Sequence, residues 1–375
     1  MVLPNLCGGG AERVTLTLAS EFTSRGIEVD IVLMSCDGEL LDQVPETVSV
    51  VDLKATRIRQ VPLAFARYLD KQKPSAVIAN MWPLTNACIV ARFIAKSKAR
   101  LVVCEHVTLS NSYRDWGLVH RIFLRQSIAA LYPLADARVS VSTGVASDLS
   151  ALAGISRSRF DVIYNPIVIR SPSSSAAAEV DAAWRGWSGK RILSVGTLKK
   201  QKNQAILIRA FSRMVEKDDA RLMILGEGFL RDELESLARE LGIYEKVLLP
   251  GFFMDPAPIY GSANLFVLSS DYEGFGNVIV EALACGLPVV STDCPSGPAE
   301  ILENGRYGRL VPVRDAEALA KAMGEALAAD HDLEALKRRA AEFSPERAAD
   351  QYLALMFPDN VALQRGRHKL GLEQI

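Results

Sequence analysis

The chain has 375 residues, of which 49% are hydrophobic and 23% charged, the composition of a soluble globular protein with room for two domains. Its net charge of −1 argues against a nucleic-acid-binding protein, because there is no overall basic excess. The six cysteines form no CxxC pair and the four histidines form no HxxxH or HExxH motif, so no structural zinc site is expected, and a reducing cytoplasm suits the chain better than a disulfide framework.

Short apolar runs rich in β-branched residues alternate with amphipathic helical segments along the chain. In chain order they are VDIVLM (29–34), VSVVDL (48–53), AVIANM (76–81), RLVVC (100–104), ARVSVS (137–142), RILSVG (191–196), RLMILG (221–226), KVLL (246–249), NLFVLS (264–269) and LPVVS (287–291). Continuous apolar strands separated by helices predict parallel sheets buried on both faces. A run at residues 1–3 is short for a central strand of about five or six residues, so either the start lies upstream or this strand is short.

A Pro/Ser/Ala-rich segment divides these strands into two sets of five. We therefore predict two doubly wound, Rossmann-like α/β domains. The predicted boundaries are 1–170 for the first domain, 171–190 for the linker, 191–343 for the second domain, and 344–375 for a C-terminal helix and polar tail. Ligands of such domains bind at the carboxyl ends of the strands, so two facing domains would define a cleft.

Three boundaries carry local signals. Gly26 stops the helix that starts near Ala11. Asp255-Pro256 and Ser344-Pro345 each combine an N-cap residue with a proline at the first helical position. These pairs therefore predict two helix starts in the second half of the chain.

The first glycine-rich loop, in NLCGGGAERV (5–14), lies between a strand and a helix. Glycines allow close backbone approach and a helix N-terminus offers N–H groups to an anion, which favours contact with a phosphate or a sugar. The dinucleotide fingerprint GxGxxG fails because Arg13 stands at its third glycine, although Asp37 could serve as the acid of an NAD site. An NAD site and a plain tight turn are the alternatives.

A lysine-rich loop, SVGTLKKQKNQ (194–204), follows the first strand of the second half. Its three lysines, Lys199, Lys200 and Lys202, would suit charge-assisted contacts to a diphosphate. A solvated basic loop is the alternative. The GxxxxGK[ST] spacing of a P-loop ATPase is absent.

Two further loops follow the next strands. LGEGFLRDEL (225–234) pairs two glycines, Gly226 and Gly228, before a helix, and is a weak signal alone. LPGFFMDPAPIY (249–260) places Gly251 and two phenylalanines, Phe252 and Phe253, where a nucleotide base could rest against backbone and ring. A core role for one of its phenylalanines is an equally good interpretation.

His106, in CEHVTLSN (104–111), directly follows a strand of the first half. A lone histidine is more often structural than functional. Its place at the carboxyl end of a parallel strand makes it a candidate site residue here.

Two glutamates bracket a nearly apolar run in YEGFGNVIVEALACG (272–286). Glu273 falls in the loop after a strand, and Glu281 lies about one turn inside a helix that starts near Asn277. The helix N-terminus between them can hold a phosphate. Burying Glu281 would be costly without a partner, and a ribose diol could supply it. Helix-end electrostatics with a solvated glutamate is the alternative.

The motif EGFGNVIVE (273–281) resembles the E-x7-E motif of glycosyltransferase family 4, whose members are retaining, nucleotide-sugar-dependent enzymes of GT-B fold. The resemblance extends over nearly the whole chain. It includes GGGAER, EH at 105–106, VGTLKKQKN, LGEG, LPGF, ALACGLPVVSTDCPSGPAEIL (282–302) and NGRYGRLVPVRD (304–315). In combination these motifs are highly specific, whereas each alone would be weak.

The resemblance implies roles for the matching positions. Catalytic roles fall to His106 beside the reacting sugar, Lys202 on the diphosphate and Glu273 near the transferred sugar. Donor-binding roles fall to Gly9, Gly10, Thr197, Lys199, Gly226, Phe252, Gly274, Phe275, Gly276, Asn277 and Glu281, of which Glu281 binds ribose. Many members have arginine where this chain has Thr197, so either Lys199 or Lys200 would replace it.

The expected activity is sugar transfer from a nucleoside-diphosphate sugar, with UDP favoured, to a glycan or a polyprenyl-pyrophosphate-linked acceptor, with retention. The leaving diphosphate would be stabilised electrostatically, and we expect no metal and no other cofactor. The DCPSGP stretch within residues 282–302 resembles that of family members that build bacterial glycans on lipid-linked or polymer acceptors. This resemblance suggests a role in bacterial surface polysaccharide synthesis. A UDP-sugar 2-epimerase of the same fold and a non-catalytic sugar-binding protein are the alternatives.

Charge is concentrated in the first half of the chain. Between Leu53 and Arg125, thirteen Lys/Arg stand against three acids, a net +10 against −11 in the remainder. No apolar run approaches the roughly 18–20 residues of a membrane span. We therefore expect a cytoplasmic protein in peripheral contact with anionic lipid on the inner face of the membrane. Residues 112–133 are the best candidate surface, although an amphipathic helix packed on a sheet has the same pattern.

Overall fold

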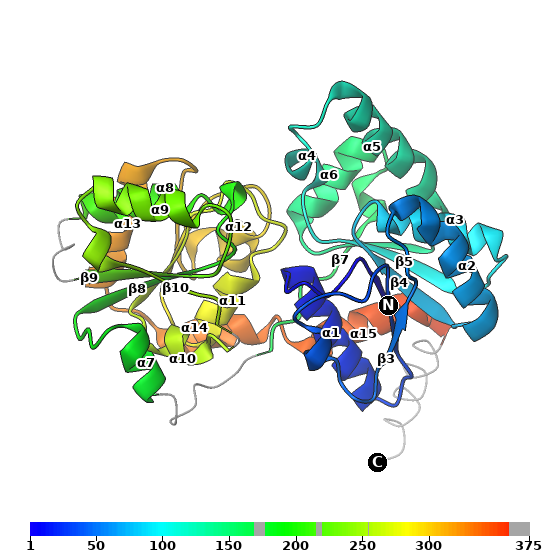
Figure 1. Ribbon diagram of the computed structural model, residues 1–375, viewed down its shortest axis with the longest axis horizontal. Helices are drawn as coiled ribbons and strands as arrows, with labels where there is room; N and C mark the ends of the chain where they lie inside the picture. The colour runs from blue at the N-terminus through cyan, green and yellow to red at the C-terminus, as the bar shows by residue number, and fades with distance from the viewer. Residues whose placement is uncertain (169–176, 215–219, 254, 360–375) are drawn as a thin grey trace, which may run out of the picture. The chain divides into compact units, whose positions relative to one another are not determined.

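The computed structural model describes residues 1–168, 177–214, 220–253 and 255–359. It divides into two compact α/β units (Figure 1). Unit 1 comprises Met1–Pro166 and Pro345–Ile375, and unit 2 comprises Ile167–Ser344. The prediction of two doubly wound domains is therefore confirmed.

The sheet of unit 1 has the strand order β3-β2-β1-β4-β5-β6-β7, with parallel neighbours throughout. Its strands are β1 (Val2–Leu3), β2 (Asp30–Leu33), β3 (Ser49–Asp52), β4 (Ala76–Asn80), β5 (Arg100–Glu105), β6 (Ala137–Ser140) and β7 (Asp161–Val162). Its α-helices are α1 (Gly10–Ser24), α2 (Val61–Gln72), α3 (Leu84–Ile94), α4 (Leu109–Ser112), α5 (Leu118–Leu131), α6 (Thr143–Ala153) and α15 (Pro345–Met356). The carboxyl ends of these strands therefore share one edge.

The sheet of unit 2 has the order β10-β9-β8-β11-β12-β13 and is also parallel. Its strands are β8 (Lys190–Val195), β9 (Ala220–Leu225), β10 (Val247–Gly251), β11 (Leu265–Leu268), β12 (Val289–Thr292) and β13 (Arg309–Val311). Its α-helices are α7 (Ala177–Ala183), α8 (Gln204–Arg213), α9 (Arg231–Glu240), α10 (Ala257–Ser262), α11 (Asn277–Ala284), α12 (Pro298–Ile301), α13 (Ala316–Ala328) and α14 (Leu333–Ala341). Figure 1 shows α8, α9 and α13 on one face of this sheet and α10, α11 and α14 on the other.

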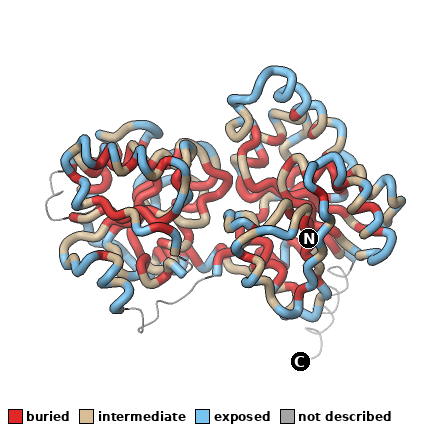
Figure 2. Tube along the Cα trace, in the orientation of Figure 1, coloured by how far each residue is buried: buried red, intermediate tan, exposed pale blue. Residues whose placement is uncertain are grey.

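Burial explains why the apolar runs were readable as strands. All four residues of β11 and all four of β12 are buried, because helices cover both faces of the sheet (Figure 2). All ten predicted runs are strands. The short strands β7 and β13 were not predicted, since Asp161–Val162 and Arg309–Val311 carry charged residues and lie at sheet edges. The first strand is short: Val2 and Leu3 both pair with β2, and Val2 also pairs with β4.

The last described helix, α15, belongs to unit 1 although it follows unit 2 in the chain. It packs beside α1, where Arg25 Nη1 lies 2.5 Å from Asp350 Oδ1. Its Tyr352 hydroxyl lies 3.2 Å from the Cys104 thiol of β5, and both side chains are buried. The predicted C-terminal helix thus completes the core of the first unit. Residues 360–375 of the predicted tail lie outside the described residues.

Residues 169–176 of the predicted linker lie outside the described residues. From Ala177 onward the same segment belongs to unit 2 and forms α7. Trp184 is fully buried and donates from Nε1 to the Ser262 hydroxyl at 2.9 Å. The second half of the predicted linker is therefore a packed part of unit 2.

The local helix signals give the observed ends to within about one residue. Helix α1 ends at Ser24, and Gly26 follows with a φ of 76°. Helix α10 begins at Ala257, whose N–H donates to Asp255 Oδ1 at 3.2 Å. Helix α15 begins at Pro345.

Candidate active site

The loops after β8, β9 and β10 pack against one another at the carboxyl edge of the unit 2 sheet. The Gly196 N–H donates to Leu225 O at 2.9 Å, and the Gly226 N–H donates to Gly251 O at 2.8 Å. A Cβ on Gly226 would lie 2.3 Å from Gly196 O, and Gly226 has a φ of +137°. Backbone packing between loops therefore requires glycine at 226, whether or not a ligand also approaches it.

Lys202 and Glu273 meet at this edge, although 71 positions separate them in the chain. Lys202 Nζ lies 2.7 Å from Glu273 Oε1, and the Ser270 hydroxyl donates to the same oxygen at 2.6 Å. The Glu273 side chain is only 7% exposed and that of Lys202 17%. Two donors on one oxygen compensate the desolvation of this carboxylate.

Hydrogen bonds to the neighbouring loop hold the lysine in place. Lys202 is the last residue of a short 3₁₀ segment, Lys200–Lys202. The carbonyl oxygen of Lys202 accepts from the Ser269 hydroxyl at 2.9 Å. Gln201 Nε2 donates to Tyr272 O at 2.8 Å. These contacts fix the main chain of the lysine loop, and the ion pair with Glu273 then fixes the ammonium group.

Helix α11 begins between the two glutamates, as predicted. Its N-cap is Gly276, with a φ of 103° and no side-chain cap. The preceding loop is held by the segment after β12, since the Ser296 hydroxyl donates to Gly274 O at 3.1 Å. A Cβ on Gly297 would lie 1.8 Å from Phe275 O. The α11 N-terminus thus has a defined backbone that an anionic group could approach.

Glu281 is half-buried on α11 and has a protein partner that was not predicted. The Tyr260 hydroxyl of α10 donates to Glu281 Oε2 at 2.8 Å. Burial raises the pKa of Tyr260 well above its usual value, with the nearby Glu281 carboxylate adding to the rise. The phenol therefore remains a donor that fixes the carboxylate at neutral pH.

The remaining predicted donor-binding residues of unit 2 lie on loops at the same edge. Thr197 is exposed and Lys199 is half-buried after β8, while Lys200 is exposed. Phe252 follows β10 and is 47% exposed, so it is not a core residue. Of the three lysines in the loop, the structure pairs Lys202 with Glu273.

The predicted glycines of unit 1 lie at the carboxyl end of β1. Gly9 is the N-cap of α1, Gly10 is its first residue, and both are exposed. A Cβ on Gly9 would lie 2.3 Å from Glu12 Oε2. The absence of a side chain at Gly9 therefore leaves room for the glutamate of the first helical turn.

His106 lies just past the carboxyl end of β5 and is only 8% exposed. Its Nε2 lies 2.9 Å from Asn80 Oδ1, on the neighbouring strand β4. Burial lowers the pKa of His106 to about 4, so the imidazole is neutral near pH 7. The preceding Glu105 accepts from the Tyr132 hydroxyl, and burial raises its pKa to about 7.

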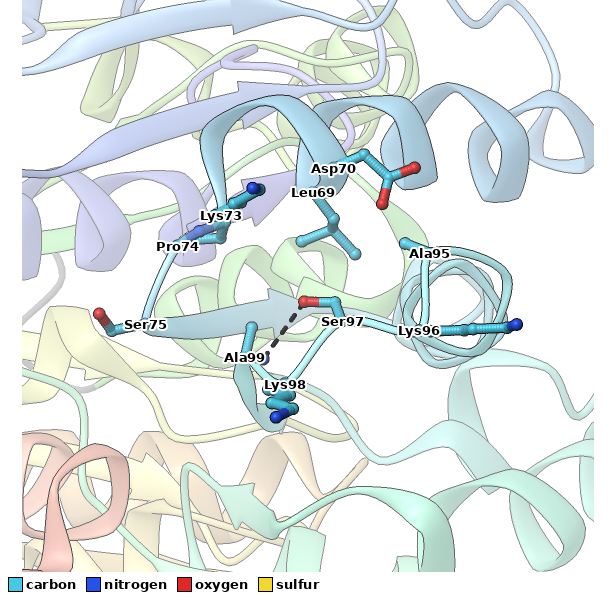
Figure 3. A pocket seen from close by; sticks show the side chains of 10 residues that line it. All are labelled: Leu69, Asp70, Lys73, Pro74, Ser75, Ala95, Lys96, Ser97, Lys98 and Ala99. Atoms are coloured by element: carbon cyan, nitrogen blue, oxygen red, sulfur yellow. Dashed lines mark hydrogen bonds between the residues drawn. The ribbon is translucent and has the colours of Figure 1, made fainter.

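One hollow in the described surface lies away from these residues. It has a volume of about 480 Å³ and is lined from segments 69–75 and 95–99, at the amino-terminal ends of β4 and β5 (Figure 3). Two of its lining residues are joined by a hydrogen bond, in which the N–H of Ala99 donates to Ser97 Oγ at 3.2 Å. Because parallel α/β sheets bind ligands at the opposite edge, we assign the site to the carboxyl ends.

No group of three or more His, Cys, Asp or Glu side chains in that part of the chain is arranged to hold a metal ion. No described helix has both the length and the apolar character needed to cross a bilayer.

Three contributors were missed from the sequence. Tyr260 looks like an ordinary core residue of α10, and Ser270 is one of two adjacent serines after β11. Asn80 had a usable signal, because it is the one polar residue closing the apolar strand AVIAN next to the His106 strand.

Comparison with known proteins identifies the family. Residues 8–170 match the family "Glycosyltransferase Family 4", and residues 189–329 match "Glycosyl transferases group 1". The N-acetylgalactosamine-N,N'-diacetylbacillosaminyl-diphospho-undecaprenol 4-alpha-N-acetylgalactosaminyltransferase of Campylobacter jejuni is 33% identical over 349 residues, covering 90% of this chain and 92% of the relative. The chain belongs to glycosyltransferase family 4.

Two solved structures share the fold of this chain. Anabaena HepE, in complex with UDP and glucose, superposes with a TM-score of 0.79 at 23% identity, covering 96% of this glycosyltransferase and 98% of HepE. The lipopolysaccharide outer core galactosyltransferase WaaB gives a TM-score of 0.73 at 18% identity, over 96% and 99% of the two chains. The predicted GT-B fold is confirmed.

Proposed function

We propose that this glycosyltransferase transfers a sugar from a nucleoside-diphosphate sugar, with UDP as the nucleotide, and retains the anomeric configuration. The observation that carries the proposal is the Lys202–Glu273 ion pair beside the start of α11. A positioned cation, a helix N-terminus and a carboxylate thus lie together at the carboxyl edge of the unit 2 sheet. A diphosphate leaving group requires the first two, and a transferred sugar offers hydroxyls to the third.

In the proposed mechanism, negative charge develops on the diphosphate as its bond to the sugar breaks. Lys202 and the N-terminus of α11 stabilise this charge, and Glu273 orients the transferred sugar. A front-face route, in which the leaving phosphate accepts the proton of the acceptor hydroxyl, needs no dedicated base. Transfer with retention then requires no metal ion.

Glu281 is proposed to bind the ribose of the donor. A carboxylate can accept from both hydroxyls of a ribose diol, and one of its oxygens is already held by Tyr260 at 2.8 Å. This partner explains how the carboxylate stays oriented in the free protein. In that arrangement the diphosphate lies over the helix start, between Glu281 and Glu273.

The proposed acceptor is a glycan or a polyprenyl-diphosphate-linked sugar of bacterial surface polysaccharide or glycoconjugate synthesis. The Campylobacter relative is named for a diphospho-undecaprenol acceptor, and WaaB for the lipopolysaccharide outer core. HepE was solved with UDP and glucose, which supports the choice of UDP.

Thermal-shift measurements with UDP-, GDP- and ADP-sugars test the donor. A saturating donor should raise the unfolding temperature, since a ligand that binds only the folded state stabilises it. Stabilisation by GDP- or ADP-sugars alone would overturn the choice of UDP.

Incubation with the donor alone tests the competing 2-epimerase, because an epimerised sugar appearing without acceptor identifies that activity. A third candidate, a non-catalytic sugar-binding protein, predicts binding without either product.

A peripheral membrane contact is proposed for the outer face of α5, on the inner face of the membrane. Four of its apolar side chains are 50–77% exposed, namely Leu118, Val119, Ile122 and Phe123. Arg121 and Arg125 are exposed on the same helix, which has no acidic residue. Exposed apolar and basic side chains together suit an anionic lipid surface.

A further inference from the structure

His106 is held through one ring nitrogen, and its other ring nitrogen has no hydrogen-bond partner in the part of the chain that the structure describes. Nε2 lies 2.9 Å from Asn80 Oδ1, and both side chains are more than nine-tenths buried. Nδ1 is buried and has no hydrogen-bond partner among the described residues. A buried nitrogen in this state has lost its water without gaining a donor, which calls for an explanation.

The orientation of the Asn80 amide follows from its second contact. Asn80 Nδ2 lies 3.1 Å from Val2 O on β1, the strand on the other side of β4. A carbonyl oxygen can only accept, so the amide must turn its NH₂ group to Val2. Its oxygen then faces the imidazole and can only accept there. Nε2 of His106 must therefore carry the hydrogen.

A neutral imidazole has a single N–H, so the location of that hydrogen decides the role of Nδ1. Burial favours the uncharged ring, because a charged imidazolium would lose its solvation. With the hydrogen on Nε2, Nδ1 keeps its lone pair. It can accept a hydrogen bond but cannot donate one.

We propose that Asn80 is a positioning residue that holds His106 as the neutral Nε2–H tautomer, so that Nδ1 is available as a hydrogen-bond acceptor for a substrate hydroxyl at the carboxyl edge of the unit 1 sheet. The tautomer rests on the geometry of unit 1, and the substrate hydroxyl rests on the proposed function. In this arrangement His106 orients that hydroxyl and transfers no proton, and the hydroxyl would complete the hydrogen bonds of Nδ1.

Nitrogen NMR of the full-length protein labelled with ¹⁵N-histidine tests the tautomer without measuring activity. The chain has four histidines, and the His106 signals are those missing from a His106→Gln variant. We expect a one-bond proton correlation at Nε2, an unprotonated Nδ1, and no change from about pH 8 to about pH 6. A hydrogen on Nδ1, or a charged ring in that range, would overturn the proposal even if the enzyme transfers sugar as proposed.

A double-mutant cycle tests whether Asn80 acts through His106. Asn80→Ala should lower kcat about tenfold, the equivalent of one hydrogen bond, and the double variant with His106→Ala should be no slower than His106→Ala alone. Additive losses would show that Asn80 acts independently and would overturn the positioning role. Ser140→Ala is the control for a general packing defect. It removes a buried hydroxyl of unit 1 that has no hydrogen-bond partner among the described residues. If Asn80→Ala fails to fold, the NMR measurement on the unaltered chain still decides the tautomer.

Discussion

Lys202 Nζ and Glu273 Oε1 lie 2.7 Å apart at the carboxyl edge of the unit 2 sheet, joining the loop after β8 to the loop after β11. The pair is mostly buried, and the Ser270 hydroxyl shares the same carboxylate oxygen. In the free protein Glu273 thus holds the cation that we assign to the donor diphosphate. Binding of the donor would add an anion to a site whose cation is already positioned, which lowers the cost of ordering it.

Replacing Lys202 by alanine should lower kcat by about 10² to 10³, because a fixed charge on the leaving diphosphate acts mainly in the transition state. Steady-state transfer assays measure this effect. Lys321→Ala is the control, since the Lys321 side chain is 78% exposed on α13 of the same unit and its loss should change kcat little. Equal losses in both variants would show that unit 2 contributes only general positive charge.

Replacing Glu281 by glutamine should raise the donor KM about tenfold, because a neutral amide accepts more weakly from a ribose diol. Glutamine still offers an oxygen to Tyr260, so the loss does not come from an orphaned phenol. Tyr260→Phe should raise the donor KM by less. Glu233→Ala, an exposed carboxylate of α9, is the control. A drop in kcat without a change in KM would contradict the ribose assignment.

The buried carboxyl of Glu105 should make stability depend on pH. Burial raises its pKa from 4.5 to about 7, so the folded state binds the proton more tightly than the unfolded state. This contribution is fully present below about pH 4.5 and is lost as the pH rises through about 7. The Glu105→Gln variant lacks this carboxyl. Its free energy of unfolding, relative to that of the unaltered chain, should therefore increase by on the order of 3 kcal/mol from about pH 5 to about pH 8.

Denaturant unfolding of the two proteins at both pH values measures this difference. The comparison cancels the opposite contribution of His106, whose lowered pKa is the same in both chains. A constant difference at both pH values would contradict the pKa assigned to Glu105.

Two glycines of unit 2 offer a matched test of loop packing. Gly297 and Gly305 both have positive φ, at 95° and 100°. A Cβ at 297 would lie 1.8 Å from Phe275 O, whereas nothing lies within 4 Å of one at 305. Gly305→Ala should cost only the backbone term of about 1–2 kcal/mol, and Gly297→Ala clearly more.

Thermal unfolding and donor binding measure this pair of variants. Gly297→Ala should also weaken donor binding, because the displaced Phe275 lies in the loop that leads into α11. Equal stabilities would mean that the loop after β12 moves aside without cost.

The α5 surface predicts binding to anionic vesicles. Arg121→Glu combined with Arg125→Glu should abolish flotation with them, and Phe123→Ser should weaken it, because charge attraction and apolar insertion act together. Arg306→Glu and Phe229→Ser are the controls, since both side chains are more than 70% exposed on unit 2. Flotation that does not depend on the charge of the lipid would contradict the proposed α5 surface.

Strands and helix starts were predictable where one local rule decides the outcome. Continuous apolar runs marked the buried strands, and Ser344-Pro345 marked the start of α15. The destination of α15 was not predictable, because Tyr352 could pack in either core and only the folded chain brings it to Cys104.

The candidate site was predictable in part. The family resemblance singled out Lys202 and Glu273, but the sequence does not show which lysine of the loop contacts Glu273. Tyr260 and Asn80 were missed because each acts by orienting another residue across the fold. Such contacts depend on strand and helix neighbours that only the structure supplies.

The most direct test of the account is calorimetric titration of UDP and of uridine into the unaltered chain and into Lys202→Ala. The central claim is that Lys202 binds the donor diphosphate. It predicts that Lys202→Ala weakens UDP binding about tenfold or more while uridine affinity is unchanged. Unchanged UDP affinity, or an equal loss for UDP and uridine, would contradict it.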